Sequence, residues 1–199
     1  MLFGTGSQFR PVPGSPKAQV AIRAYRSSDE NVCRDLYRLN EQGRFPPDYE
    51  PDFVRTLRRN DYLKVIAEEN MTIVGVGAVC LVKFLRRALL AFGMVHPQWH
   101  RRGVGTALLL ARAAALPEPS PRWTLVLSTL SGSRSFYERF GFTKYGQHRD
   151  KIRGSRFDDH YAHLNRDAWT ECHRAAAHLG IAATSLPDVP QMNIKNNGP

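Results

Sequence analysis

Two glycines and two arginines stand directly before the most apolar helical segment of the sequence, in HPQWHRRGVGTALLLARAAAL at residues 96–116. Gly103 and Gly105 occupy positions where Ser, Thr or Asp would cap a helix better, and glycine there costs backbone entropy. The first amides of a helix lack partners and carry about half a positive charge from the helix dipole. We therefore expect an anion at these amides, because no Cβ blocks its approach.

The arginines beside the glycines fit the same chemistry. Arg101 and Arg102 add charged donors at the rim of the loop, where a diphosphate would lie. The spacing is not that of a GxGxxG dinucleotide loop, and the Gly-Lys-Ser/Thr ending of a Walker loop is missing. The alternative is a tight strand-to-helix turn in which both glycines serve packing.

The residues around this loop indicate a family. VHPQWHRRGVGTALL at residues 95–109 resembles motif A of the GNAT acyltransferase superfamily, where Gln/Arg-x-x-Gly-x-Gly/Ala follows strand four. SFYERFGF at residues 135–142 resembles motif B, and one helix plus one strand separates the two motifs, as in the family. The resemblance covers roughly residues 20–165. It departs from the family pattern at His100, where Gln or Arg is usual.

In GNAT proteins the loop amides bind the pyrophosphate of acyl-CoA, and the backbone of strand four pairs with the pantetheine arm. The resemblance therefore implies a site for acetyl-CoA or another acyl-CoA. Its residues are Met94, Val95, His100, Arg101, Arg102, Gly103, Val104, Gly105 and Thr106. A bulge that splays strands four and five forms the slot in the family, and Gly93 is suited to such a bulge.

Tyr137 corresponds to the tyrosine of motif B, which in the family commonly protonates the departing CoA thiolate. A phenol held near sulfur can supply that proton, so we expect Tyr137 to be the catalytic residue. The alternative is an aromatic side chain that packs beside Phe136 and Phe140.

The general base is not identified by the sequence. Many relatives place a glutamate on strand four or a neighbouring strand, but ALLAFGMV at residues 88–95 has no carboxylate. The remaining candidates are Glu68, Glu69, His96, Asp158, Asp159 and His160. Proton loss through ordered water is an equal alternative. No metal is expected, because Cys172, His173 and His178 lack a fourth ligand at suitable spacing.

Hydrophobic periodicity and turn residues predict the elements that position these side chains. Strands are expected at residues 21–25, 62–69, 72–83, 88–95, 123–129, 142–148 and 157–164. Helices are expected at 27–43, after the loop 45–50, and at 103–116, 131–142 and 165–180. This order predicts an α/β (α+β) fold with one domain. The resemblance implies a mixed, mostly antiparallel sheet, splayed between strands four and five, with helices on both faces.

The GNAT-like acyltransferase domain is expected at residues 19–165, with a C-terminal helix at 166–182 packed on it. Residues 1–18 are rich in Gly, Pro and Ser, and residues 183–199 have a similar character. Such composition is typical of chain ends without a packed core, so we expect a disordered N-terminal tail and a flexible C-terminal tail.

The formal net charge of +10 fits a polyanionic partner such as a nucleotide cofactor or nucleic acid, although no nucleic-acid-binding motif accompanies it. No apolar run approaches the roughly 20 residues that span a bilayer, and no signal peptide is recognised. The three cysteines contain no CxxC pair. We therefore expect a cytoplasmic protein with reduced thiols and no membrane partner.

Together these observations predict an N-acyltransferase, most simply an acetyltransferase, which moves an acyl group from acyl-CoA to a primary amine by direct attack in a ternary complex. In the family the acceptor lies along elements that correspond to residues 30–60 and 144–164. Arg55, Arg58 and Arg59 would favour an acidic acceptor. A non-catalytic CoA-sensing or interaction module and an RNA-directed (aminoacyl-tRNA) acetyltransferase stay open. The acceptor, the acyl chain length and a homodimer are undecided.

Overall fold

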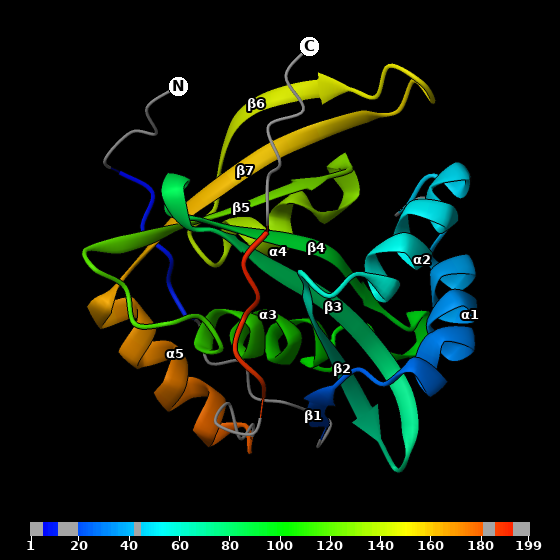
Figure 1. The fold of residues 1–199 in the computed structure, drawn as a ribbon, viewed down its shortest axis with the longest axis horizontal. Coiled ribbons are helices and arrows are strands. Elements are labelled where there is room, and N and C mark those ends of the chain that lie inside the picture. Colours follow the sequence, from blue (N-terminus) through cyan, green and yellow to red (C-terminus); the bar gives the residue numbers. More distant parts are fainter. Residues whose placement is uncertain (1–5, 12–19, 42–44, 181–185, 193–199) are drawn as a thin grey trace.

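A computed structural model describes residues 6–11, 20–41, 45–180 and 186–192 (Figure 1). Its centre is a seven-stranded sheet in the order β1-β2-β3-β4-β5-β7-β6. The strands are β1 Ala21–Ala24, β2 Leu63–Glu69, β3 Thr72–Val82, β4 Arg87–Val95, β5 Arg122–Thr129, β6 Thr143–Arg149 and β7 Arg156–Asn165. The helices are α1 Glu30–Asn40, α2 Glu50–Arg58, α3 Val104–Ala114, α4 Arg134–Glu138 and α5 Arg166–His178. Each predicted strand and helix is present, and α4 is shorter than the helix expected at 131–142.

The sheet is mixed and mostly antiparallel, as predicted. The one parallel pairing among the described strands joins β4 to β5, and it covers only Arg87–Leu89 opposite Thr124–Val126. Beyond these residues the two strands no longer pair. Further along, between Ala91 and Met94, the pairing of β4 with β3 has a register shift, and Phe92 adopts a left-handed conformation with φ of 45°. The bulge expected near Gly93 is therefore present, and it bends β4 away from β5.

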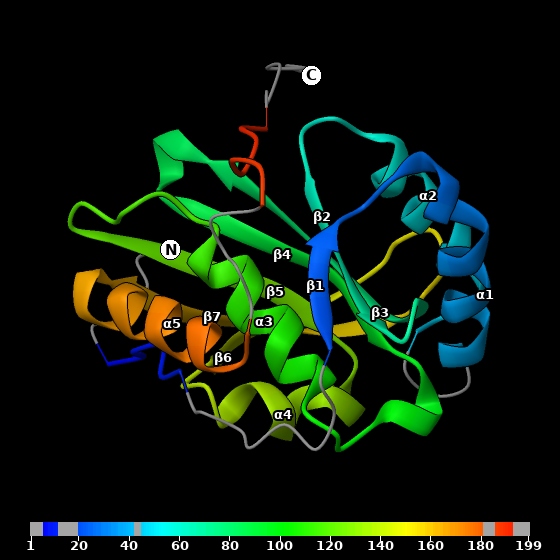
Figure 2. The same ribbon diagram turned by 90° about the horizontal axis from the view of Figure 1, so that it is seen from below.

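Helices cover both faces of the sheet, which confirms the predicted layers. α3 and α5 lie side by side across one face (Figure 2). α3 is apolar on nearly all sides because it is enclosed between the sheet and α5. α1 and α2 pack against the other face, where Tyr37 and Phe53 meet Val76 and Met94. Alternate strand residues therefore build two separate cores.

Residues 6–11 fall within the predicted N-terminal tail, and here the structure differs from the prediction. The amide of Phe9 donates to the carbonyl of His163 over 2.7 Å, and the amide of His163 donates to Ser7 over 2.7 Å. The Phe9 ring is buried against Phe140 and Phe142. One aromatic side chain thus anchors a segment whose composition alone indicates disorder.

Residues 186–192 differ from the predicted C-terminal tail in the same way. Leu186 and Val189 are buried, and the amide of Leu81 donates to the carbonyl of Pro190 over 3.0 Å. The amide of Met192 donates back to Leu81 over 2.7 Å. Apolar residues spaced along a Pro-rich segment suffice to hold it on β3. The remaining parts of both predicted tails lie outside the described residues.

Two further findings concern the part of the chain that the structure describes. Within the described ranges, no helix combines the length and the apolar character needed to cross a membrane. Cys33, Cys80 and Cys172 are buried, and none forms a disulfide.

Candidate active site

A cavity of about 720 Å³ opens where β4 and β5 part. The end of β4, the loop before α3, α3 itself and the α4 segment form its walls, and the end of α1 and the following loop lie at its far side. The lining residues are Asn40, Phe45, Gly93, Val95, Trp99, His100, Arg101, Gly103, Gly105, Thr106, Leu108, Arg112, Gly132, Ser133, Ser135, Phe136, Tyr137 and Arg139. The cavity therefore joins the predicted cofactor loop to the predicted acceptor side.

The two glycines of the loop have different structural roles. Gly103 precedes α3 with φ of 90°, a left-handed conformation that favours glycine, and no side chain caps the helix there. Gly105 lies in the first turn, where a Cβ would stand 3.4 Å from the Phe136 ring. The N-terminal end of α3 is thus uncapped by any side chain and borders the cavity, as an anion site requires.

Most of the predicted site residues come together around this cavity. Those that line it are Val95, His100, Arg101, Gly103, Gly105, Thr106 and Tyr137. Three others do not. Met94 and Val104 are buried in the two cores, so only their main chains are available for the predicted contacts. The guanidinium of Arg102 lies over the Trp99 ring, 4.7 Å from its centroid.

His100, which departs from the family motif, ties the loop to the end of β4. Its Nε2 lies 2.9 Å from the carbonyl oxygen of Val95 and donates to it. This hydrogen bond holds the loop before α3 against the strand that lines the cavity. His100 therefore both stabilises the position of the loop and lines the cavity.

Tyr137 projects from α4 into the same cavity. Its ring contacts Phe136 and Phe142 edge-on, with centroids 5.0 and 5.6 Å apart. Burial raises the pKa of the Tyr137 hydroxyl, and the neighbouring Arg112 guanidinium opposes that shift. The hydroxyl is thus protonated at neutral pH while it faces the cavity. Both interpretations of Tyr137, as a packing aromatic and as a proton donor, agree with this geometry.

Arg112 is the residue of this site that the sequence analysis missed. It stands on α3 with an exposed fraction of 2 % and lines the cavity. Its Nε donates to the carbonyl of Leu108 over 3.0 Å, and Nη1 donates to that of Ala78 over 3.3 Å. The sequence carried a signal for it, because Arg112 is the one residue of α3 after Thr106 that is neither Leu nor Ala.

The candidate carboxylate bases take part in other contacts. Glu68 pairs with Arg23 at 3.0 Å, and Asp158 pairs with Lys144 at 2.6 Å. Asp159 accepts from the Ser128 hydroxyl over 2.6 Å. None of the carboxylates that the structure describes lines the cavity.

The histidine candidates are likewise away from the reaction space. The His96 ring caps the short helix Pro97–Trp99 by accepting from the Gln98 amide over 3.3 Å. His160 is fully buried, its Nδ1 is 3.1 Å from the carbonyl of Asp158, and burial lowers its pKa. Across the described ranges, no three His, Cys, Asp or Glu side chains are grouped to hold a metal ion.

The two segments predicted to carry the acceptor are in contact. The Tyr49 hydroxyl donates to Asp150 over 2.5 Å, and Arg153 pairs with Asp52 at 2.5 Å. The guanidinium of Arg153 also lies over the Tyr49 ring, 4.3 Å from its centroid. The tip of the β6–β7 hairpin is therefore fastened to the start of α2.

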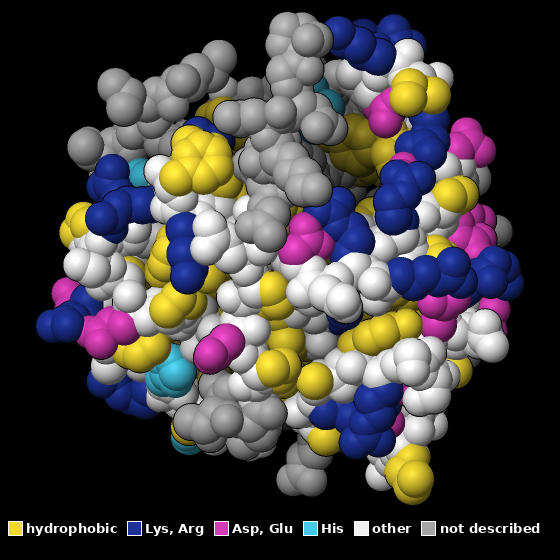
Figure 3. Space-filling model, viewed as in Figure 1, with side chains coloured by type: hydrophobic (Ala, Val, Ile, Leu, Met, Phe, Trp, Pro, Cys, Tyr) yellow, Lys and Arg dark blue, Asp and Glu magenta, His cyan; other side chains and the backbone are white. Residues whose placement is uncertain are grey.

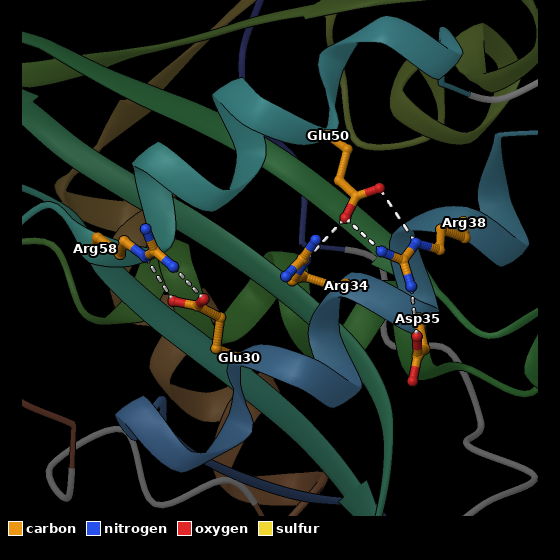
Figure 4. A network of polar contacts seen from close by, with 6 residues as sticks. All are labelled: Glu30, Arg34, Asp35, Arg38, Glu50 and Arg58. Atoms are coloured by element: carbon orange, nitrogen blue, oxygen red, sulfur yellow. Dashed lines mark hydrogen bonds and ion pairs between the residues drawn. The ribbon is translucent and has the colours of Figure 1, made fainter.

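The arginines of α1 and α2 are paired with carboxylates. Figure 3 shows Lys and Arg side chains beside Asp and Glu side chains over these helices. Arg58 pairs with Glu30 at 2.7 Å, and Glu50 accepts from both Arg34 and Arg38 (Figure 4).

The other two arginines predicted to favour an acidic acceptor are paired as well. Arg55 pairs with Asp52 at 2.6 Å, and Arg59 pairs with Asp61. The attraction of this surface for an acidic acceptor is accordingly reduced.

Comparison with known proteins agrees with this geometry. The family model described as "Acetyltransferase (GNAT) domain" matches residues 60–144, which run from β2 into β6 and include both motifs. No curated protein sequence matches the chain.

Solved structures share the fold at low sequence identity. The ribosomal-protein-S18-alanine N-acetyltransferase from Escherichia coli is 20% identical with a TM-score of 0.55, covering 72% of this chain and 93% of its own. A putative GNAT-family acetyltransferase from Desulfovibrio desulfuricans is 19% identical with a TM-score of 0.58, covering 73% and 98%. The PaiA N-acetyltransferase from Thermoplasma acidophilum, in complex with coenzyme A, is 16% identical with a TM-score of 0.54, covering 73% and 99%. The chain therefore has the fold of these N-acetyltransferase structures, and its residues 60–144 match the GNAT acetyltransferase domain model.

Proposed function

We propose that the protein is an N-acyltransferase, most simply an acetyltransferase, that transfers an acyl group from acyl-CoA to a primary amine by direct attack in a ternary complex. The observation that carries the proposal is the cavity at the splay of β4 and β5, which joins the uncapped end of α3 to Tyr137. The GNAT domain match and the coenzyme A bound to the PaiA structure support it.

The residues present fit the diphosphate of CoA. Gly103 and Gly105 place no side chain at two positions around the start of α3, and Thr106 lines the same wall. Arg101 adds a guanidinium at the rim of the cavity. The helix amides and the nearby guanidinium together favour binding of a doubly charged group. The free edge of β4 at Met94 and Val95 would take the pantetheine arm, and His100 would keep the loop in place.

Bound acetyl-CoA would supply an activated thioester. As the amine nitrogen bonds to the acyl carbon, the carbon–sulfur bond breaks and sulfur gains an electron pair. Tyr137 would hold a proton at Oη for that sulfur, so that CoA leaves as a neutral thiol. The amine must first lose its ammonium proton. Since no described carboxylate lines the cavity, water would take that proton.

The acyltransferase domain would span residues 19–165, with residues 166–182 packed on it. The acceptor would enter from the side of Asn40 and Phe45, beneath the joined hairpin tip and α2. The free cysteines support a cytoplasmic enzyme. The missing cavity carboxylate favours one rival, a CoA-binding module without transfer activity.

Two measurements test the proposal. Calorimetry at physiological ionic strength should register binding of CoA, and a thiol-release assay should detect transfer from acetyl-CoA to a panel of small amines, peptide N-termini, lysine peptides and charged tRNA. CoA binding without transfer to any acceptor would favour the CoA-binding module. Absence of CoA binding would contradict both.

A further inference from the structure

Arg112 carries a buried positive charge, and no described carboxylate pairs with it. Burial lowers the pKa of its guanidinium. The guanidinium donates hydrogen bonds to main-chain carbonyls of α3, β3 and β4. Burying a charge is costly unless it is paired. Leucine at position 112 should therefore stabilise the packing of α3 more than arginine does.

Two glycines make room for this guanidinium. A Cβ on Gly77 of β3 would stand 3.0 Å from Cζ of Arg112. A Cβ on Gly93 of β4 would stand 3.2 Å from its Nη2 and 3.4 Å from Oη of Tyr137. The guanidinium of Arg112 and the hydroxyl of Tyr137 therefore both lie beside Gly93 of β4, on the wall of the cavity.

The chemistry of the two groups determines which one donates. A guanidinium has N–H donors and no acceptor, and it stays charged across the physiological pH range. Where the Arg112 guanidinium meets the Tyr137 hydroxyl at Gly93, the phenolic oxygen must therefore be the acceptor. The proton of Tyr137 is consequently left for another acceptor, and the cavity that both residues line is where one would be bound.

We propose that Arg112 is a positioning residue for Tyr137: it holds the phenolic oxygen as an acceptor, directs the phenolic proton into the cavity, and stabilises the phenolate left after that proton is transferred. This inference rests on the proposed acyltransferase function. Arg112 keeps all its own protons. The O–H bond of Tyr137 breaks, an S–H bond forms, and the negative charge passes from sulfur to an oxygen beside a fixed cation.

Three variants test the role through activity. Arg112→Gln keeps a donor for the carbonyls but removes the charge, and Arg112→Lys keeps the charge. We expect Arg112→Gln to lower kcat by about tenfold or more without changing the KM for acetyl-CoA, and Arg112→Lys to restore much of the loss. In a Tyr137→Phe background, Arg112→Gln should have no further effect, because it acts through the hydroxyl. An equal loss in both backgrounds would assign Arg112 a merely structural role.

A spectroscopic readout separates this inference from the proposed function, because it needs no turnover. With ¹³Cζ-labelled tyrosine, the Tyr137 resonance, identified by its loss in Tyr137→Phe, should shift in Arg112→Gln and stay near its original position in Arg112→Lys. If Arg112→Gln does not fold, the ¹⁵Nε resonance of Arg112 should shift in Tyr137→Phe. Unmoved resonances would overturn the inference even in an active enzyme. Moved resonances in an inactive protein would leave the coupling standing and remove the acyltransferase function.

Discussion

Gly141 lies directly against the main chain of Gln8. A Cβ at Gly141 would come 2.0 Å from the carbonyl oxygen of Gln8, and Gly141 has φ of 80°. The amide of Arg10 donates to Phe140 over 2.9 Å, so the N-terminal segment crosses the end of motif B. The packing of residues 6–11 across the chain after α4 therefore explains why the motif SFYERFGF has glycine at position 141.

Gly141→Ala should destabilise the fold by at least about 1–3 kcal/mol, because the left-handed conformation is strained for alanine and the main chain of Gln8 must move. Urea unfolding followed by circular dichroism measures this. Gly180→Ala is the matched control, since Gly180 has φ of 70° but nothing within 4 Å of an added Cβ. Equal losses in the two variants would show that contact with Gln8 carries no energy.

Tyr137→Phe should lower turnover at least about tenfold and leave CoA affinity nearly unchanged, because the ring packing remains while the proton donor is lost. Thiol release and calorimetry measure the two quantities. Tyr145→Phe is the control, because this partly exposed tyrosine of β6 does not line the cavity. Turnover equal to that of the wild type would exclude Tyr137 from the mechanism.

Gly105→Asp should weaken CoA binding about tenfold or more, because it places a side chain and a negative charge where the diphosphate is proposed to lie. Stability should be nearly unchanged, since a carboxylate in the first turn of α3 favours the helix dipole. Gly6→Asp adds the same charge where nothing lies within 4 Å. Unaltered affinity in Gly105→Asp, measured by calorimetry, would place the diphosphate elsewhere.

Stability should depend on pH through Asp29. Burial alone would raise the pKa of this carboxyl, but hydrogen bonds from Arg23 and the Arg26 amide lower it below the ordinary value. A lowered folded-state pKa gives stability that is present above the unfolded pKa, about 4, and lost as pH falls through the folded value.

Asp29→Asn should therefore cost about 1–3 kcal/mol at pH 7 and progressively less below about pH 4. Urea unfolding at a series of pH values measures the difference. Asp35→Asn serves as the control, because the Asp35 side chain is 69 % exposed. A loss that stays constant from pH 7 to pH 2 would mean that the charge of Asp29 contributes nothing.

Asp150→Ala should raise the KM for the amine without changing the KM for acetyl-CoA, because it removes the hydrogen bond from Tyr49 and loosens the hairpin tip, which Arg153 and Asp52 still hold. Steady-state kinetics with each substrate varied in turn make the comparison. Asp35→Ala again provides an exposed control. If the KM for the amine does not respond, the contact between the hairpin and α2 plays no part in acceptor binding.

Local pattern was enough to predict most of the fold. Alternating apolar residues and turn residues predicted every strand, whereas the layers and the splay of strands four and five were implied by the resemblance to the GNAT superfamily. The glycine loop was predicted because helix ends, glycine and arginine have fixed local chemistry. The tyrosine of motif B was found by resemblance, since spacing alone does not distinguish it from Phe136 and Phe140.

Contacts between distant segments were beyond local pattern. Arg112 looked like one polar position in an apolar helix, and only the sheet brought it to Gly77, Gly93 and Tyr137. Phe9 stood in a segment of disordered composition, yet it found a place between Phe140 and Phe142.

Backbone conformation and hydrophobic periodicity act over a few residues, so the sequence by itself determined the elements, their order and the anion-binding loop. The burial of a charge, the partner of a glycine and the packing of a chain end depend on residues that lie far away in the sequence. The tertiary structure decided those, because desolvation and packing are properties of the assembled core.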